Sequence, residues 1–154
     1  VTGLVAGTAT GVYAAEGTKD ATANTSFGVG GNLSLEITDG STVFFGEDLE
    51  PGQEHKAQNA TTIKVDSNID MTWEITISKS VEARPNINSQ YFDDEVVKNE
   101  LSVSLDKSTG TGTKGGIKAS YTLKDLRYNT AGTLMTDFPE GFYKIAVTYT
   151  VAAS

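Results

Sequence analysis

Cysteine is absent from this chain of 154 residues, and histidine and tryptophan occur once each. The absence of cysteine excludes disulfides, thiolate metal sites and thiol nucleophiles, and it fits a chain that leaves the reducing cytosol without using oxidation for stability. Because His55 is the single histidine, it has no second imidazole with which to bind a metal ion, and we expect it in a solvated loop. No cofactor and no metal ion are expected.

Positive charge is also scarce, since the formal net charge is -8. Such a chain repels polyanions, and no cluster of lysine and arginine with interleaved aromatic residues offsets this repulsion, so nucleic acid is not an expected partner. Long apolar runs are missing as well. No membrane span is therefore expected in the mature chain.

Catalytic motifs are missing too: there is no nucleophile elbow, no phosphate-binding loop and no dinucleotide fingerprint. Carboxylates are grouped at Glu47 with Asp48, at Asp66 with Asp70, and at residues 93–95, all in predicted loops or turns. We interpret these groups as solvated acidic loops. A hydrolase using them, or a calcium site at Asp66, Asn68 and Asp70, stays as a weaker alternative. The chain is not expected to be an enzyme.

Alternating apolar and polar residues are the main positive signal, because alternation places one set of side chains on a buried sheet face. Such segments predict strands around residues 33–37, 43–45, 63–65, 71–77, 101–105, 117–123 and 143–151. Trp73 alternates with other apolar residues and is predicted to be buried. The fold predicted is all-β, a two-sheet β-sandwich of jelly-roll or immunoglobulin-like type.

Helix is predicted only as short turns. Residues 93–101 suit about two turns with Asp93 as the cap, and a second single turn is expected near residues 124–128. The glycine-rich residues 108–116 are expected to form a long, flexible loop of a hairpin between residues 101–105 and 117–123.

The N-terminal segment is unusual because it carries no charge before Glu16 and consists of β-forming residues spaced by glycine, alanine and threonine. We predict a long extended strand at residues 1–18, donated to a neighbouring subunit, followed by a sandwich domain at residues 19–154. The side chains expected at the subunit interface are Val1, Leu4, Val5, Ala9, Val12 and Tyr13. A plainer alternative is that the segment is the first strand of its own sandwich.

Export is also expected. The first residue is Val1 rather than methionine, which indicates processing, with removal of a signal peptide and an extracellular or cell-surface location. In an alternative interpretation, the segment up to Ala14 is itself the last part of a signal peptide, with the cleavage site after Ala14. Three sequons, at Asn24, Asn32 and Asn59, are candidate glycosylation sites, with Asn24 and Asn59 favoured by their loops.

The chain resembles donor-strand filament subunits such as archaeal bundling pilins and the TasA-like fibre proteins of biofilm matrices. The similarity lies in the small-residue N-terminus and in GNLSLEITDG, KVDSNIDMTWEITI and PEGFYKIAVTYTVAAS, about half of the chain. This resemblance implies a homopolymer of identical subunits in a pilus or biofilm fibre, side-to-side bundling and no catalysis. The rival function is a monomeric secreted module, carbohydrate-binding or adhesive, that would use Tyr91, Phe92, Tyr121 and Tyr128 on an exposed sheet face.

Overall fold

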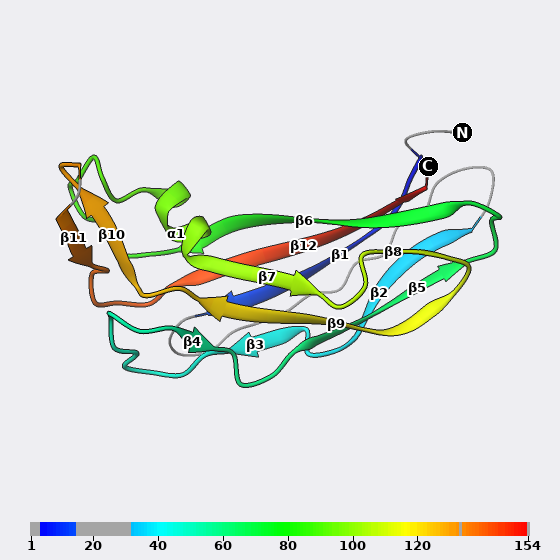
Figure 1. Cartoon of the computed structure of the whole chain (residues 1–154), viewed down its shortest axis with the longest axis horizontal. Coiled ribbons are helices and arrows are strands. Elements are labelled where there is room, and N and C mark those ends of the chain that lie inside the picture. Colours follow the sequence, from blue (N-terminus) through cyan, green and yellow to red (C-terminus); the bar gives the residue numbers. More distant parts are fainter. Residues whose placement is uncertain (1–3, 15–31, 133, 154) are drawn as a thin grey trace.

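The computed structural model describes residues 4–14, 32–132 and 134–153, and for residues 4–14 it describes the backbone only. Figure 1 shows two layers of strands with one short helix, α1 (Asp94–Glu100), lying across one end. The strands are β1 (Leu4–Ala14), β2 (Leu33–Asp39), β3 (Thr42–Phe44), β4 (His55–Lys56), β5 (Thr61–Ser67), β6 (Thr72–Ala83), β7 (Leu101–Leu105), β8 (Thr109–Thr111), β9 (Lys114–Leu123), β10 (Arg127–Thr130), β11 (Leu134–Asp137) and β12 (Lys144–Ala153).

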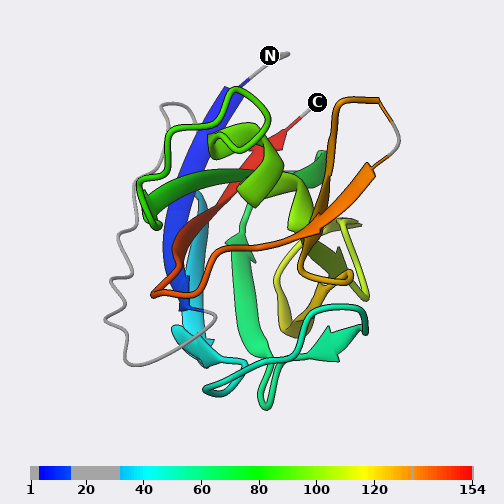
Figure 2. The same ribbon diagram turned by 90° about the vertical axis from the view of Figure 1, so that its left-hand side faces the viewer.

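The strands form two main sheets and a separate hairpin. The first sheet has the order β3-β1-β12-β6-β8, and the second has the order β2-β5-β9-β4, with β7 also paired to β9. Pairing is antiparallel except between β1 and β3, which are parallel. The hairpin β10-β11 projects at one end (Figure 2). The prediction of an all-β, two-sheet sandwich is confirmed.

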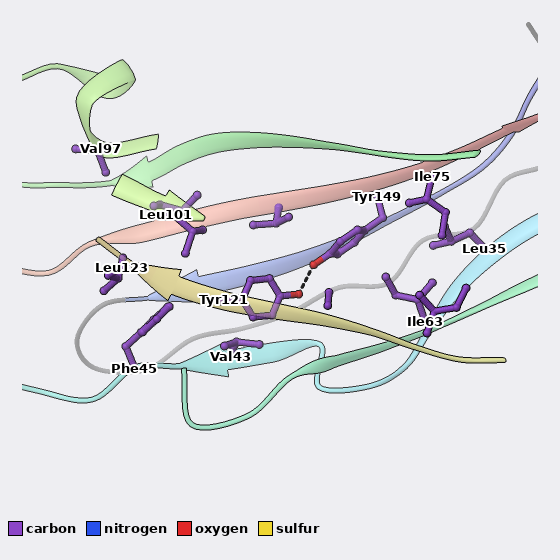
Figure 3. Close-up of a cluster of buried hydrophobic side chains, with 14 of the residues drawn as sticks. Leu35, Val43, Phe45, Ile63, Ile75, Val97, Leu101, Tyr121, Leu123 and Tyr149 are labelled. Atoms are coloured by element: carbon purple, nitrogen blue, oxygen red, sulfur yellow. Dashed lines mark hydrogen bonds between the residues drawn. The ribbon is translucent and has the colours of Figure 1, made fainter. Parts of the chain in front are cut away.

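The core lies between the two sheets and follows the alternation of the sequence. Trp73, Val147 and Tyr149 from the first sheet are fully buried, as are Leu35 and Ile63 from the second. Figure 3 shows their neighbours filling the space between the layers. Each fully buried large apolar side chain contributes roughly 1.5–3 kcal/mol relative to exposure. The predicted burial of Trp73 is confirmed.

The helix begins where the sequence indicates. Asp93 is the N-cap, and its carboxylate accepts a hydrogen bond of 3.0 Å from the backbone N–H of Val96. Val97 and Leu101 are buried against the sheets. The second predicted helical turn, at residues 124–128, is wrong. Leu126 has a positive φ of 54° there, and β10 begins at the next residue.

The glycine-rich segment is also more ordered than expected. Strands β7 and β9 do pair as a hairpin, but the loop between them contains β8, which crosses to the first sheet and pairs with β6. The indole N–H of Trp73 donates to the carbonyl of Gly112 at 2.8 Å. The expectation of a flexible loop is therefore wrong, because this segment covers the buried tryptophan.

Candidate functional site

The N-terminal strand β1 lies between β3 and β12 in the first sheet. Its backbone pairs with β12 from Leu4 opposite Ala153 to Ala14 opposite Lys144, with one irregularity between Val5 and Gly7. On its other side, residues 12–14 pair with β3. Five predicted interface residues lie on this strand, namely Leu4, Val5, Ala9, Val12 and Tyr13. Val1 lies outside the described residues.

Strand β12, against which β1 lies, is buried along most of its length. Ile145, Val147, Tyr149 and Val151 face the core, and Ala146 on the other face is also buried. A strand this apolar, left without one partner, exposes a row of backbone N–H and C=O groups and attracts another strand. In the single chain, β1 takes that place. Donation of β1 to a neighbouring subunit stays a prediction.

The outer edge of β3 is covered by a side chain that sequence analysis considered only as a glycan acceptor. The Asn59 amide donates to the carbonyl of Thr42 at 2.9 Å and accepts from the N–H of Phe44 at 3.4 Å. The backbone N–H of Gln58 donates to the carbonyl of Phe44 at 3.0 Å. These bonds close the edge of the sheet next to β1.

The same contacts bear on the sequons. Asn59 is exposed, but Thr61, the hydroxyl residue of its sequon, is fully buried and donates to the carbonyl of Gly40 at 2.8 Å. A glycan at Asn59 would therefore have to be added before this region folds. Asn32 is exposed at the start of β2, where its backbone N–H donates to the Asn68 side chain at 2.8 Å. Asn24 lies outside the described residues.

The two ends of the sandwich differ. At one end, which we call the cleft end, β1 finishes and β12 begins, and a cleft of about 720 Å³ opens beside them. At the other, the turn end, residues 68–71 join β5 to β6, and β2 begins with Leu33 opposite Ser67. Figure 1 places the start of β1 and the end of β12 at the turn end and the β10-β11 hairpin at the cleft end.

The cleft is acidic at its rim and aromatic at its base. Asp48, Glu50, Asp137 and Glu140 are exposed around it. Its base includes Phe138 and Tyr143, which belong to a cluster of aromatic rings with Phe92 and Tyr128, where the Phe92 and Phe138 centroids are 5.2 Å apart. Among the described residues, no group of three or more His, Asp or Glu side chains is placed to hold a metal ion. The cleft is thus an acidic surface with a rigid apolar floor.

The other grouped carboxylates are engaged in local structure. Asp94 pairs with Arg84 at 2.6 Å, Glu95 with Lys98 at 2.6 Å, and Asp66 with Lys64 at 3.3 Å. His55, expected in a solvated loop, is half-buried in β4, and its Nε2–H donates to the carbonyl of Glu50 at 2.8 Å. Asp66, Asp94, Glu95 and His55 thus take part in local contacts.

Two ionisable groups, the buried Glu100 and the half-buried Lys79, were not found from the sequence. Glu100 is 5% exposed, and its Oε2 accepts 2.8 Å hydrogen bonds from the N–H groups of Asp125 and Leu126. Burial raises the pKa of its carboxyl above the usual 4.5 against the opposing effect of these bonds. Lys79 donates to the carbonyls of Lys98 and Leu101 at the end of α1, and burial lowers the pKa of its amine. Neither residue has a local sequence signal, because its partners are distant in the chain.

The aromatic residues proposed for a sugar-binding face are mostly internal. Phe92, Tyr121 and Tyr128 are buried, and only Tyr91 of the four is exposed. The Tyr121 hydroxyl instead donates to Thr61 at 2.5 Å and is hydrogen-bonded to the Tyr149 hydroxyl inside the core (Figure 3). These residues do not form an exposed platform.

Comparison of the chain with protein-family models, with curated proteins and with solved structures gives no match. Within the described ranges, no helix has the length and apolar character that crossing a bilayer requires. Functional argument therefore rests on the chain itself.

Proposed function

We propose that this protein is a non-catalytic structural subunit of an extracellular filament, which polymerises when β1 of one chain takes the place of β1 in the next. The observation that carries the proposal is the position of β1: it precedes every other described strand in the chain, yet it lies inside its sheet, between β3 and β12. The pairings of β12 with β6 and of β6 with β8 do not involve β1, so they can persist when β1 leaves. The same backbone pairs with β12 and β3 would then form between two chains.

Energetics support exchange rather than loss of the strand. Each backbone hydrogen bond contributes a net 0.5–1.5 kcal/mol or so, and the β1-β12 pairing runs from Leu4 to Ala14. A subunit whose place for β1 is empty is therefore unstable until a strand enters, as in other cases of strand addition. Exchange from chain to chain is head-to-tail and does not close on itself, so it propagates a fibre. Lateral bundling of such fibres is part of the same proposal.

A second candidate is the monomeric secreted binding module, and one observation favours it: β1 completes the sheet of its own chain. The two candidates differ in whether β1 must leave that sheet for the protein to act.

A reversible disulfide between β1 and β12, which locks β1, distinguishes the two candidates. Because the chain has no native cysteine, only the two introduced cysteines can form it. Thr10 lies directly opposite Thr148, and such opposed residues in an antiparallel pair have Cα atoms about 4.5–5.5 Å apart, which is within the range that a disulfide spans. We expect oxidised Thr10→Cys/Thr148→Cys monomer to form no fibres by negative-stain electron microscopy, and to form them after reduction. In the control, Thr8→Cys/Thr148→Cys, the residues are diagonal and should not bridge, so oxidant should leave fibre formation unchanged.

Mixing gives the direct test of exchange. A chain with only Thr10→Cys and a tagged chain with only Thr148→Cys should form a covalent heterodimer under oxidation. The proposal is refuted if the locked monomer assembles as fast as the reduced one, or if mixed chains never cross-link. Either result would favour the monomeric module.

A further inference from the structure

The two ends of the segment between β1 and β2 lie far apart. Ala14 is at the cleft end opposite Lys144, whereas Leu33 is at the turn end opposite Ser67. The intervening β12 runs from Lys144 to Ala153, so the two positions are separated by roughly 30 Å at 3.3 Å per residue. Residues 15–31, fully extended, reach roughly 60 Å. Within one chain, Ala14 and Leu33 thus lie at opposite ends of the sandwich.

Between exchanged chains the same connection has a shorter route. A strand held in an acceptor emerges at the acceptor's cleft end after Ala14, and it must enter its own sandwich at the donor's turn end, at Leu33. The two positions come closest when the donor's turn end faces the acceptor's cleft end. Chain connectivity therefore favours this arrangement among those within reach.

The cleft end also carries the exposed apolar side chains of the described structure. Leu134 is 63% exposed and Met135 43% exposed on β11, and Phe142, which precedes Tyr143 of the cleft, is 39% exposed. Strand β11 pairs with β10, and all four of its residues are exposed, so its apolar side chains add little to the core. Exposed apolar groups gathered at one end indicate a contact surface.

Charge supports the contact at one residue, Lys114. The rim of the cleft is acidic through Asp48, Glu50, Asp137 and Glu140. The turn end also carries acidic residues, Asp66, Asp70 and Glu74, but Lys114 opens β9 there opposite Val65 and is exposed. No described residue forms an ion pair with Lys114, so its ammonium group is available to a carboxylate of the neighbouring subunit.

We infer that the cleft end of each subunit docks on the turn end of a second copy of this chain, with Leu134, Met135 and Phe142 at the contact. This inference rests on the proposed strand exchange, and it adds a second interface that orients the subunits end to end. Burial of these three apolar side chains at the contact then stabilises the fibre without changing the fold of the subunit.

Charged substitutions at the hairpin test the contact. We expect Leu134→Asp/Met135→Asp to raise the protein concentration needed for fibre formation about tenfold or more, with an unchanged melting temperature of the locked monomer. The matched control, Ser102→Asp/Ser104→Asp, adds the same charge on exposed positions of β7 and should assemble normally. Normal assembly of the hairpin variant would overturn the docking inference.

Cross-linking tests the polarity. Chains with Leu134→Cys and chains with Asp70→Cys, joined by a short thiol-reactive cross-linker during assembly, should give mainly mixed dimers. Predominant links between two Leu134→Cys chains, between two Asp70→Cys chains, or none at all, would overturn end-to-end docking. Thr10→Cys and Thr148→Cys chains mixed in parallel separate the two ideas: if they cross-link while the end-to-end links fail, strand exchange stands and the docking surface is wrong. If they fail as well, the proposed function itself is wrong.

Discussion

Gly110 packs against the ring of Trp73, which leaves no room for a side chain. A Cβ at this position would lie 2.5 Å from Cζ2 and 2.8 Å from Cη2 of Trp73, whose ring is fully buried and cannot move aside. We expect Gly110→Ala to lower the free energy of unfolding by about 1–3 kcal/mol. Urea unfolding followed by tryptophan fluorescence measures this.

Gly115→Ala is the matched control, because its nearest neighbour would be the Lys64 side chain at 3.9 Å. It should change stability by less than about 0.5 kcal/mol. Equal effects of the two substitutions would contradict the close approach to Trp73.

The buried pair Tyr121 and Tyr149 predicts sensitivity to alkali. Burial raises the pKa of both phenols above the usual 10.0. The unfolded chain therefore loses these protons first, so the stability they confer is complete below pH 10 and falls as pH rises above it. We expect the unfolding free energy of Tyr121→Phe/Tyr149→Phe to fall less steeply between pH 10 and 11.5 than that of the native protein.

Tyr91→Phe serves as the control for the tyrosine pair, since Tyr91 is exposed. Its pH profile should match that of the native protein. If the double variant also follows the native profile, the buried pair is not the source of the alkaline loss.

At the scale of the elements, the long strands were predictable, and of the short ones β3 was indicated by the apolar residues 43–45 whereas β4, β8, β10 and β11 were not. Strands β5, β6 and β12 alternate apolar and polar residues over many positions, which is a local signal. Strand β8 has no such pattern, because it forms only by pairing with β6 next to Trp73. The predicted helical turn at residues 124–128 failed for a similar reason, since Glu100, distant in sequence, binds the N–H groups of the turn.

Glu100 thus joins the end of α1 to the turn before β10, which gives a prediction about both elements. Glu100→Ala leaves two inward-facing N–H groups without their acceptor and should destabilise the protein by roughly 2–4 kcal/mol. Glu100→Gln keeps an acceptor oxygen and should cost under about 1 kcal/mol. Chemical denaturation of the three proteins at pH 7 makes the comparison.

The pH dependence provides a further check on Glu100. Because its pKa is raised in the fold, the unfolded chain releases the proton first, and the native protein should lose stability relative to Glu100→Gln as pH rises above about 4.5. A difference that grows in the opposite direction would contradict the burial of this carboxyl as the dominant influence.

At the scale of the whole molecule, composition and alternation predicted the sandwich but not the role of its ends. The extended segment at the N-terminus was recognisable from its uncharged, glycine-spaced residues, and β1 occupies residues 4–14 of it. The cleft at the end of β1 combines residues 48–51 with residues 137–143. No local pattern brings these segments together, because both are held to the turn before β10: the N–H of Gly52 donates to the carbonyl of Asp125 at 2.7 Å, and the N–H of Phe138 donates to the carbonyl of Leu126 at 2.8 Å.

Strand exchange also predicts how stability depends on protein concentration. Assembly that favours the folded subunit raises its melting temperature by mass action, whereas an isolated fold melts at the same temperature at all concentrations. We therefore expect the reduced Thr10→Cys/Thr148→Cys protein to melt several degrees higher at high than at low concentration. The oxidised monomer, in which β1 is fixed in its own sheet, should show no such dependence. Since one protein provides both samples, a concentration effect of equal size in each would mean that association does not involve release of β1.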